Sequence, residues 1–154
     1  DAESITTDAT GRGRTGGDLM RLDPEHAHEL LARIDPGRVR SGQAIGLRDG
    51  ALLALVAAGL SAVEIATLRA SAVTMTSGKL LVAVRRHGLT WFVILPTDLG
   101  ARLIAWLTEC RLWAAPEPVF RGNRGPLTSM GICKVLERYR NHHQVPVRRR
   151  PKVP

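Results

Sequence analysis

Apolar residues recur at the spacing of an amphipathic helix over much of the chain. The clearest start signal is Asp23, which is placed to cap a helix whose first residue is proline. Leu30, Leu31 and Ile34 would form the apolar face of this helix. The Asp-Pro-Gly segment at 35–37 would end it. Further helices are predicted over residues 47–58, 62–68, 98–113 and 128–142.

The hydrophobic period changes in the middle of the chain. Residues 80–84 and 90–95 are apolar, β-branched runs typical of strands. Gly88 lies between them, so an antiparallel hairpin with residues 85–89 as its turn is predicted. The second half of the helix at 47–58 is apolar nearly all round, which favours a central position. The fold class is therefore α+β and mainly helical: a helix bundle with a small antiparallel β-hairpin or sheet.

The composition of the two ends sets the expected domain limits. Residues 1–21 are rich in Gly, Thr, Asp and Arg without any periodic pattern, which predicts a flexible basic arm. Residues 22–145 carry every predicted element and are long enough for one domain with its own core. Residues 146–154 combine prolines with cations and are expected to form a basic extended tail.

Charge narrows the class of partner. The 154-residue chain has 22 Lys and Arg residues against 14 Asp and Glu residues, which gives a formal net charge of +8. Basic groups that bind phosphates release condensed counterions, so this excess favours polyanionic partners, nucleic acid first. Hydrophobic residues make up 44% of the chain, which excludes a wholly disordered protein.

Other chemistry is sparse. Cys110 and Cys133 are the only cysteines, and their spacing suits no zinc site. Both fall in predicted helices, so buried free thiols and a reduced, cytoplasmic setting are expected. The longest apolar run, 51–60, is too short to cross a membrane, and no signal peptide is visible. His142 and His143 would point about 100° apart on a helix. No metal and no cofactor are therefore predicted.

Four motifs occur in the order found in a known family. They are L-D-P-E-H at 22–26, R-D-G-A-L-L at 48–53, G-L-S-A-V-E-I-A-T-L at 59–68 and G-P-L-T-S-M-G-I at 125–132. With the hairpin between them, they resemble the N-terminal two-thirds of the catalytic domain of tyrosine recombinases (phage integrases), over roughly residues 22–145. The resemblance implies a mainly helical domain with a three-stranded sheet and a role in DNA recombination and integration.

The same resemblance implies that the chemistry has been lost. The family cleaves DNA with a tyrosine, while arginines, a lysine and histidines stabilise charge at the phosphate. Matched by motif, Ser61 stands where the family has its first catalytic arginine, and Glu64 keeps the acidic position that follows it. The family lysine falls on or beside Arg85 and Arg86. The later histidine and arginine motif has no counterpart in this sequence. Tyr139, the only tyrosine, is expected as a half-buried residue inside the last helix.

The expected function is binding of double-stranded DNA through its phosphates, without cleavage, alone or beside an active recombinase. No catalytic residue is predicted. Recombinases assemble through a C-terminal segment that has no counterpart in this sequence, so a monomer is expected. The residues expected to contact DNA are Arg85, Arg86, His87, Arg124, Lys134, Arg138, Arg148, Arg149, Arg150 and Lys152.

Two other interpretations stay open on the sequence alone. Residues 60–75 resemble a helix-turn-helix motif, in which the segment 70–77 would form the recognition helix of a winged regulator. That segment carries no basic or amide side chain that could read base edges. Alternatively, the chain is an inert fragment of a recombinase.

Overall fold

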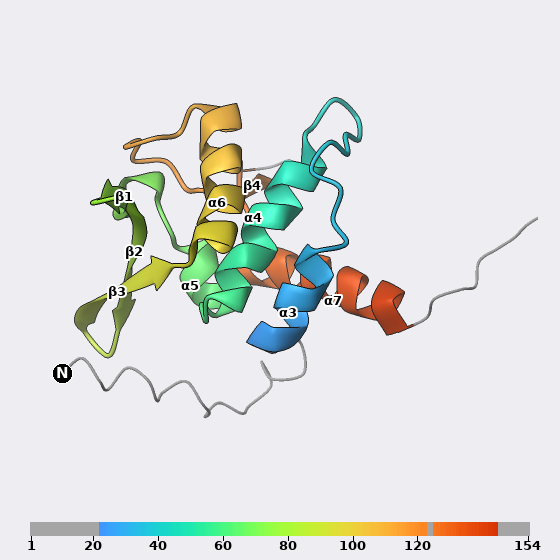
Figure 1. The fold of residues 1–154 in the computed structure, drawn as a ribbon, viewed down its shortest axis with the longest axis horizontal. Helices are drawn as coiled ribbons and strands as arrows, with labels where there is room; N and C mark the ends of the chain where they lie inside the picture. Colours follow the sequence, from blue (N-terminus) through green and yellow to red (C-terminus); the bar gives the residue numbers. More distant parts are fainter. Residues whose placement is uncertain (1–21, 123–124, 145–154) are drawn as a thin grey trace, which may run out of the picture.

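The computed structural model describes residues 22–122 and 125–144 (Figure 1). Its helices are α3 (Pro24–Leu31), α4 (Ile45–Ala57), α5 (Ala62–Ala66), α6 (Thr97–Cys110) and α7 (Ser129–Gln144), with a 3-10 turn η1 (Ala70–Ala72). Its strands are β1 (Val73–Thr76), β2 (Lys79–Arg86), β3 (Leu89–Leu95), β4 (Arg121–Gly122) and β5 (Gly125–Pro126). These elements confirm the α+β class, mainly helical with a small antiparallel sheet. The predicted arm 1–21 and tail 146–154 lie outside the described residues.

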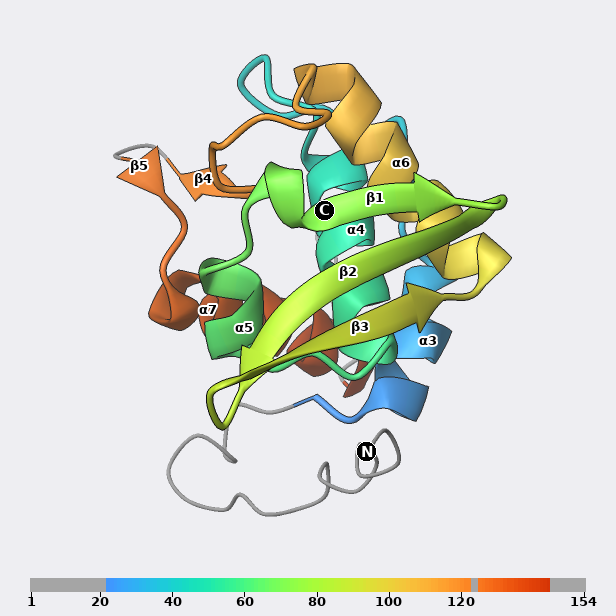
Figure 2. The ribbon, with the colours of Figure 1, turned by 90° about the vertical axis from the view of Figure 1, so that its left-hand side faces the viewer.

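Helix α4 lies at the centre of the domain, as its apolar sequence predicts. Every residue from Ala51 to Val56 is at most 5% exposed. Helices α3 and α6 pack along α4, and α5 and α7 also contact it. The three-stranded sheet lies on the α6 side of this helical layer, away from α3 (Figures 1 and 2). Leu80 and Leu95 of the sheet join Leu99 of α6 in one continuous core.

The hairpin is confirmed, but its turn is tighter than predicted. Strands β2 and β3 pair in antiparallel register as far as Arg86 and Leu89. Only His87 and Gly88 remain between them, with φ angles of 55° and 79°. Two residues with positive φ match the right-handed twist of the paired strands, so a two-residue turn is enough. Arg85 and Arg86 therefore belong to β2 and not to the turn.

The helix-turn-helix interpretation is wrong. The segment expected to form a recognition helix is a 3-10 turn followed by strand β1. Val73 is buried against the core and pairs with Val82 of β2, in a third strand at the edge of the sheet. Valine and threonine favour strands, and pairing with a neighbouring strand decides the conformation of so short a segment.

Helix ends differ from the predictions by a few residues. Helix α3 ends at Leu31, although Ile34 beyond it is still buried. Helix α6 ends at Cys110 because Arg111 takes a left-handed conformation, so the prediction that this helix continues to residue 113 is wrong. The expectation of buried thiols also fails, since Cys110 is exposed at this helix end and Cys133 is only partly buried. No helix in the described ranges is long and apolar enough to cross a membrane.

The loop between α3 and α4 is anchored at Gly46, in the first turn of α4. The backbone N–H of Gly46 donates to the carbonyl of Arg38 at 3.0 Å. A Cβ atom at this position would collide with the carbonyl oxygen of Asp35 and come within 3.0 Å of the backbone nitrogen of Arg38. Only glycine lets the loop approach the helix this closely.

Gly46→Ala is therefore expected to destabilise the domain by about 1–3 kcal/mol, because backbone atoms must move to make room. Urea unfolding followed by circular dichroism measures this change. Gly100→Ala in α6 is the matched control, because its added methyl group would meet Leu80 and Leu95 side chains at ordinary distances of 3.6–3.8 Å. The control should be neutral or stabilising, since alanine favours a helix over glycine. Equal stability of the Gly46→Ala variant and the unmodified protein would contradict the close approach.

Candidate nucleic-acid interface

Ser61, Glu64 and Arg86 form a chain of contacts between α5 and the end of β2. Ser61 caps α5: its Oγ accepts a hydrogen bond from the Glu64 backbone at 3.2 Å, and Glu64 Oε1 accepts one from the Ser61 backbone at 3.0 Å. The Glu64 carboxylate also binds the Arg86 guanidinium through two hydrogen bonds of 2.6 and 2.9 Å. Ser61, which the sequence resemblance aligned with an arginine, is thus a helix cap, and the charge of Arg86 is offset by the Glu64 carboxylate.

The three hairpin residues expected to contact DNA, Arg85, Arg86 and His87, differ in their exposure and in their contacts. Arg86 also donates to the Gly59 carbonyl at 3.4 Å, so its guanidinium ties β2 to α5 and does not fit the predicted phosphate contact. Arg85 is exposed and donates to the Gly88 carbonyl at 3.0 Å. His87 is exposed in the turn itself. Arg85 and His87 remain open to solvent at the hairpin tip.

Helix α7 carries the other described cations from the predicted set. Lys134 and Arg138 are exposed and four residues apart, so they lie on the same face of the helix. The opposite face is buried through Ile132, Val135 and Leu136. Arg124, Arg148, Arg149, Arg150 and Lys152 lie outside the described residues.

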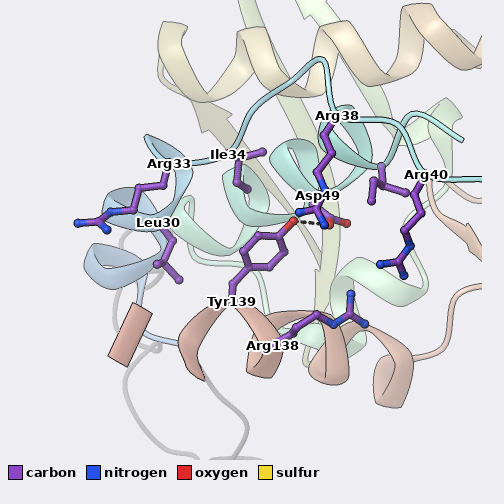
Figure 3. A pocket seen from close by; sticks show the side chains of 9 residues that line it. Leu30, Arg33, Ile34, Arg38, Arg40, Asp49, Arg138 and Tyr139 are labelled. Atoms are coloured by element: carbon purple, nitrogen blue, oxygen red, sulfur yellow. Dashed lines mark hydrogen bonds between the residues drawn. The ribbon is translucent and has the colours of Figure 1, made fainter. Parts of the chain in front are cut away.

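A cavity of about 300 Å³ opens beside α7, where α3, the α3–α4 loop and α4 meet (Figure 3). Among the described members of the predicted set, Arg138 is the one that lines it. The lining residues are Leu30, Arg33, Ile34, Arg38, Arg40, Ile45, Asp49, Arg138 and Tyr139. The fold thus gathers four arginines around one small cavity, three from the α3–α4 loop and one from α7.

Asp49 forms the floor of the cavity. It is only 1% exposed, and it is the one buried charged side chain in the part of the chain that the structure describes. The Tyr139 hydroxyl donates to its Oδ2 at 2.5 Å, and Arg48 Nε donates to its Oδ1 at 2.8 Å. A carboxylate in an apolar core needs such partners, because burying it unpaired costs several kcal/mol.

The hydrogen bond to Asp49 also affects the protonation of Tyr139. Burial raises the pKa of this tyrosine well above its ordinary value, and the hydrogen bond to Asp49 and the negative charge there raise it further. Its hydroxyl points inward to a carboxylate and keeps its proton. This confirms the prediction of a half-buried helix tyrosine and gives no support to a nucleophilic role.

Arg33, Arg38 and Arg40 were not among the residues predicted from the sequence. They lie in a segment where no motif and no periodic charge pattern marks a site. Their shared surface arises only when the loop folds back on Gly46 and α7 packs beside it. The sequence signal that could have pointed to the cavity is the pair Arg48-Asp49 inside an apolar helix. A buried carboxylate needs hydrogen-bond donors, and some of them must come from other segments of the chain.

No group of three or more metal-binding side chains occurs among the described side chains of residues 22–122 and 125–141. Comparison with known protein families, curated proteins and solved structures found no match for this chain. The proposed function therefore rests on the geometry of the described residues.

The raised pKa of Tyr139 predicts how stability depends on pH. The folded protein keeps the tyrosine proton at a pH where the unfolded chain loses it, so this contribution is complete below about pH 10 and declines above it. Tyr139→Phe should reduce this decline in urea unfolding at increasing pH. It should also lower stability at neutral pH by about 1–3 kcal/mol, because Asp49 loses a donor.

Tyr139 is the single tyrosine of the chain, so tyrosinate absorbance reports on it alone. In the folded protein this absorbance should rise only well above the ordinary midpoint near pH 10, and in urea it should rise at that midpoint. An ordinary midpoint in the folded state would contradict the buried hydrogen bond.

Proposed function

We propose that the protein binds double-stranded DNA through phosphate contacts and does not cleave it, as a catalytically degenerate relative of the tyrosine recombinases. The observation that carries this proposal is a set of exposed cations without an acidic partner. Among the described residues, no ion pair engages Arg85, Lys134 or Arg138. Exposed cations of this kind attract phosphates whatever the base sequence, and a net charge of +8 adds to that attraction.

Three contacts support the absence of cleavage. The hydroxyl of Ser61 caps α5, and the guanidinium of Arg86 is bound by the Glu64 carboxylate. The hydroxyl of Tyr139 is bound to Asp49 inside the domain. Phosphoryl transfer needs fixed donors around the phosphate and a nucleophile that can reach it. On this proposal these residues hold the fold together and take no part in a reaction.

The proposal places the protein in the cytoplasm as a monomer that occupies DNA, alone or beside an active recombinase. Its cysteines are free, which agrees with a reducing compartment. The competing possibility, an inert recombinase fragment, shares the charge but has no affinity for DNA. A binding measurement separates the two.

A gel-shift titration with a duplex oligonucleotide is expected to show binding at about 50 mM salt and release at higher salt. Arg85→Gln and Lys134→Gln should each weaken binding and reduce the salt dependence by about one phosphate contact. Lys79→Gln, at the other end of β2 from Arg85, removes the same charge and should have the smaller effect. Absence of any shift at the low salt concentration would reject the proposal and favour the inert fragment.

Ser61→Arg is expected to restore no cleavage and to cost about 1 kcal/mol of stability, because the helix cap is lost. A nicked suicide substrate that traps covalent protein–DNA adducts measures the first effect, and urea unfolding measures the second. Ser61→Asp is the matched control, since aspartate also caps helices and should keep the stability. A trapped adduct with either protein would overturn the absence of catalysis.

A further inference from the structure

The cavity beside α7 combines converging positive charge with an apolar wall. In Figure 3 the side chain of Arg38 extends toward the Tyr139–Asp49 hydrogen bond, while Arg40 and Arg138 extend toward the same side of the cavity. Arg33 also lines the cavity, but its guanidinium points away from these three. The charge is thus concentrated on one side of the opening.

No carboxylate pairs with these three guanidiniums in the described part of the chain. No hydrogen bond or ion pair engages the guanidinium of Arg38, Arg40 or Arg138 among the side chains that the structure describes, those of residues 22–122 and 125–141. Asp49 is the only carboxylate in the lining, and its oxygens already accept from Arg48 and Tyr139. Like charges that converge without a counterion repel one another, and a bound anion would relieve that repulsion.

The rest of the lining suits a flat apolar group. Leu30, Ile34 and Ile45 supply aliphatic side chains, and Tyr139 supplies an aromatic ring whose hydroxyl is turned into the floor. A volume of about 300 Å³ lies at the lower end of the range of small-molecule sites. The occupant therefore has an anionic end for the arginines and a planar body for the apolar wall.

We propose that this cavity binds one nucleoside monophosphate unit, either a free mononucleotide or the 5′-terminal nucleotide of a DNA strand. Arginine guanidiniums bind phosphate through paired, charge-assisted hydrogen bonds, which assigns the phosphate to Arg40 and Arg138. The base lies against the ring of Tyr139 and the neighbouring aliphatic side chains, since every base has a face that stacks on an aromatic ring. This site goes beyond duplex binding and does not depend on it.

Calorimetric titration of the full chain with the common deoxynucleoside monophosphates tests the assignment. At least one of them is expected to bind about tenfold or more tightly than its nucleoside and than inorganic phosphate, because only the nucleotide uses both halves of the cavity. Arg40→Gln and Arg138→Gln should each weaken that binding about tenfold or more, as expected for loss of a charged hydrogen bond. Both arginines are exposed, so both variants should fold normally by circular dichroism.

Arg85→Gln is the matched control, because it removes the same charge from a residue that does not line the cavity. It should leave nucleotide binding unchanged while weakening duplex binding. Two results would overturn the proposal: inorganic phosphate that binds as tightly as every nucleotide, or nucleotide binding that is equal in the Arg40→Gln, Arg138→Gln and unmodified proteins.

Short single strands with and without a 5′-phosphate separate the two sources of the ligand. A preference for the phosphorylated strand over the free mononucleotide supports a strand end as the occupant, and the reverse order supports the free nucleotide. Failure of duplex binding with intact nucleotide binding would reject the proposed function alone. Intact duplex binding without nucleotide binding would reject the cavity assignment alone.

Discussion

A buried carboxylate constrains how the helices are arranged around α4. Asp49 lies in α4, a helix of mainly apolar residues, where an ionised side chain is costly unless its oxygens are bonded. Arg48 is its neighbour in sequence, but Tyr139 comes from α7, ninety residues away. Helix α7 must therefore keep its position against α4, and Arg138 is carried to the cavity with it. One polar contact thus links core stability to the surface where the free cations gather.

The structure divides the arginines into two groups that net charge alone cannot separate. Arg86 is neutralised by Glu64, Arg48 by Asp49, and Arg102 donates to the carbonyl of Leu31 at the end of α3. These side chains join helices and strands to one another. The arginines around the cavity make no such contact with another described residue. Phosphate binding should depend on cations that have no carboxylate partner, so a count of basic residues overstates the charge that is available to a partner.

Local rules account for most of the elements, and long-range contacts account for the rest. Three features could be predicted because each depends on residues close in sequence. They are the helix cap at Asp23, the turn at Gly88 and the apolar run of α4. The resemblance implied a third strand, but the residues of β1 did not mark its position, because its conformation depends on pairing with β2. The arginine cavity was missed for the same reason, since Arg38 and Arg138 are a hundred residues apart and meet only in the folded chain.

Binding of phosphate and cleavage of a phosphodiester make different demands on a protein, so a protein can bind DNA without the means to cleave it. Attraction to phosphate needs only exposed cations at roughly suitable positions, and it tolerates their rearrangement. Cleavage needs donors and a nucleophile fixed around one phosphate, so the loss of one position removes it. In this chain Ser61 caps a helix, and Arg86 is held in an ion pair with Glu64. Arg85 at the hairpin tip and Lys134 and Arg138 on α7 are exposed and form no ion pair with a described residue, and the proposed DNA binding would use these cations.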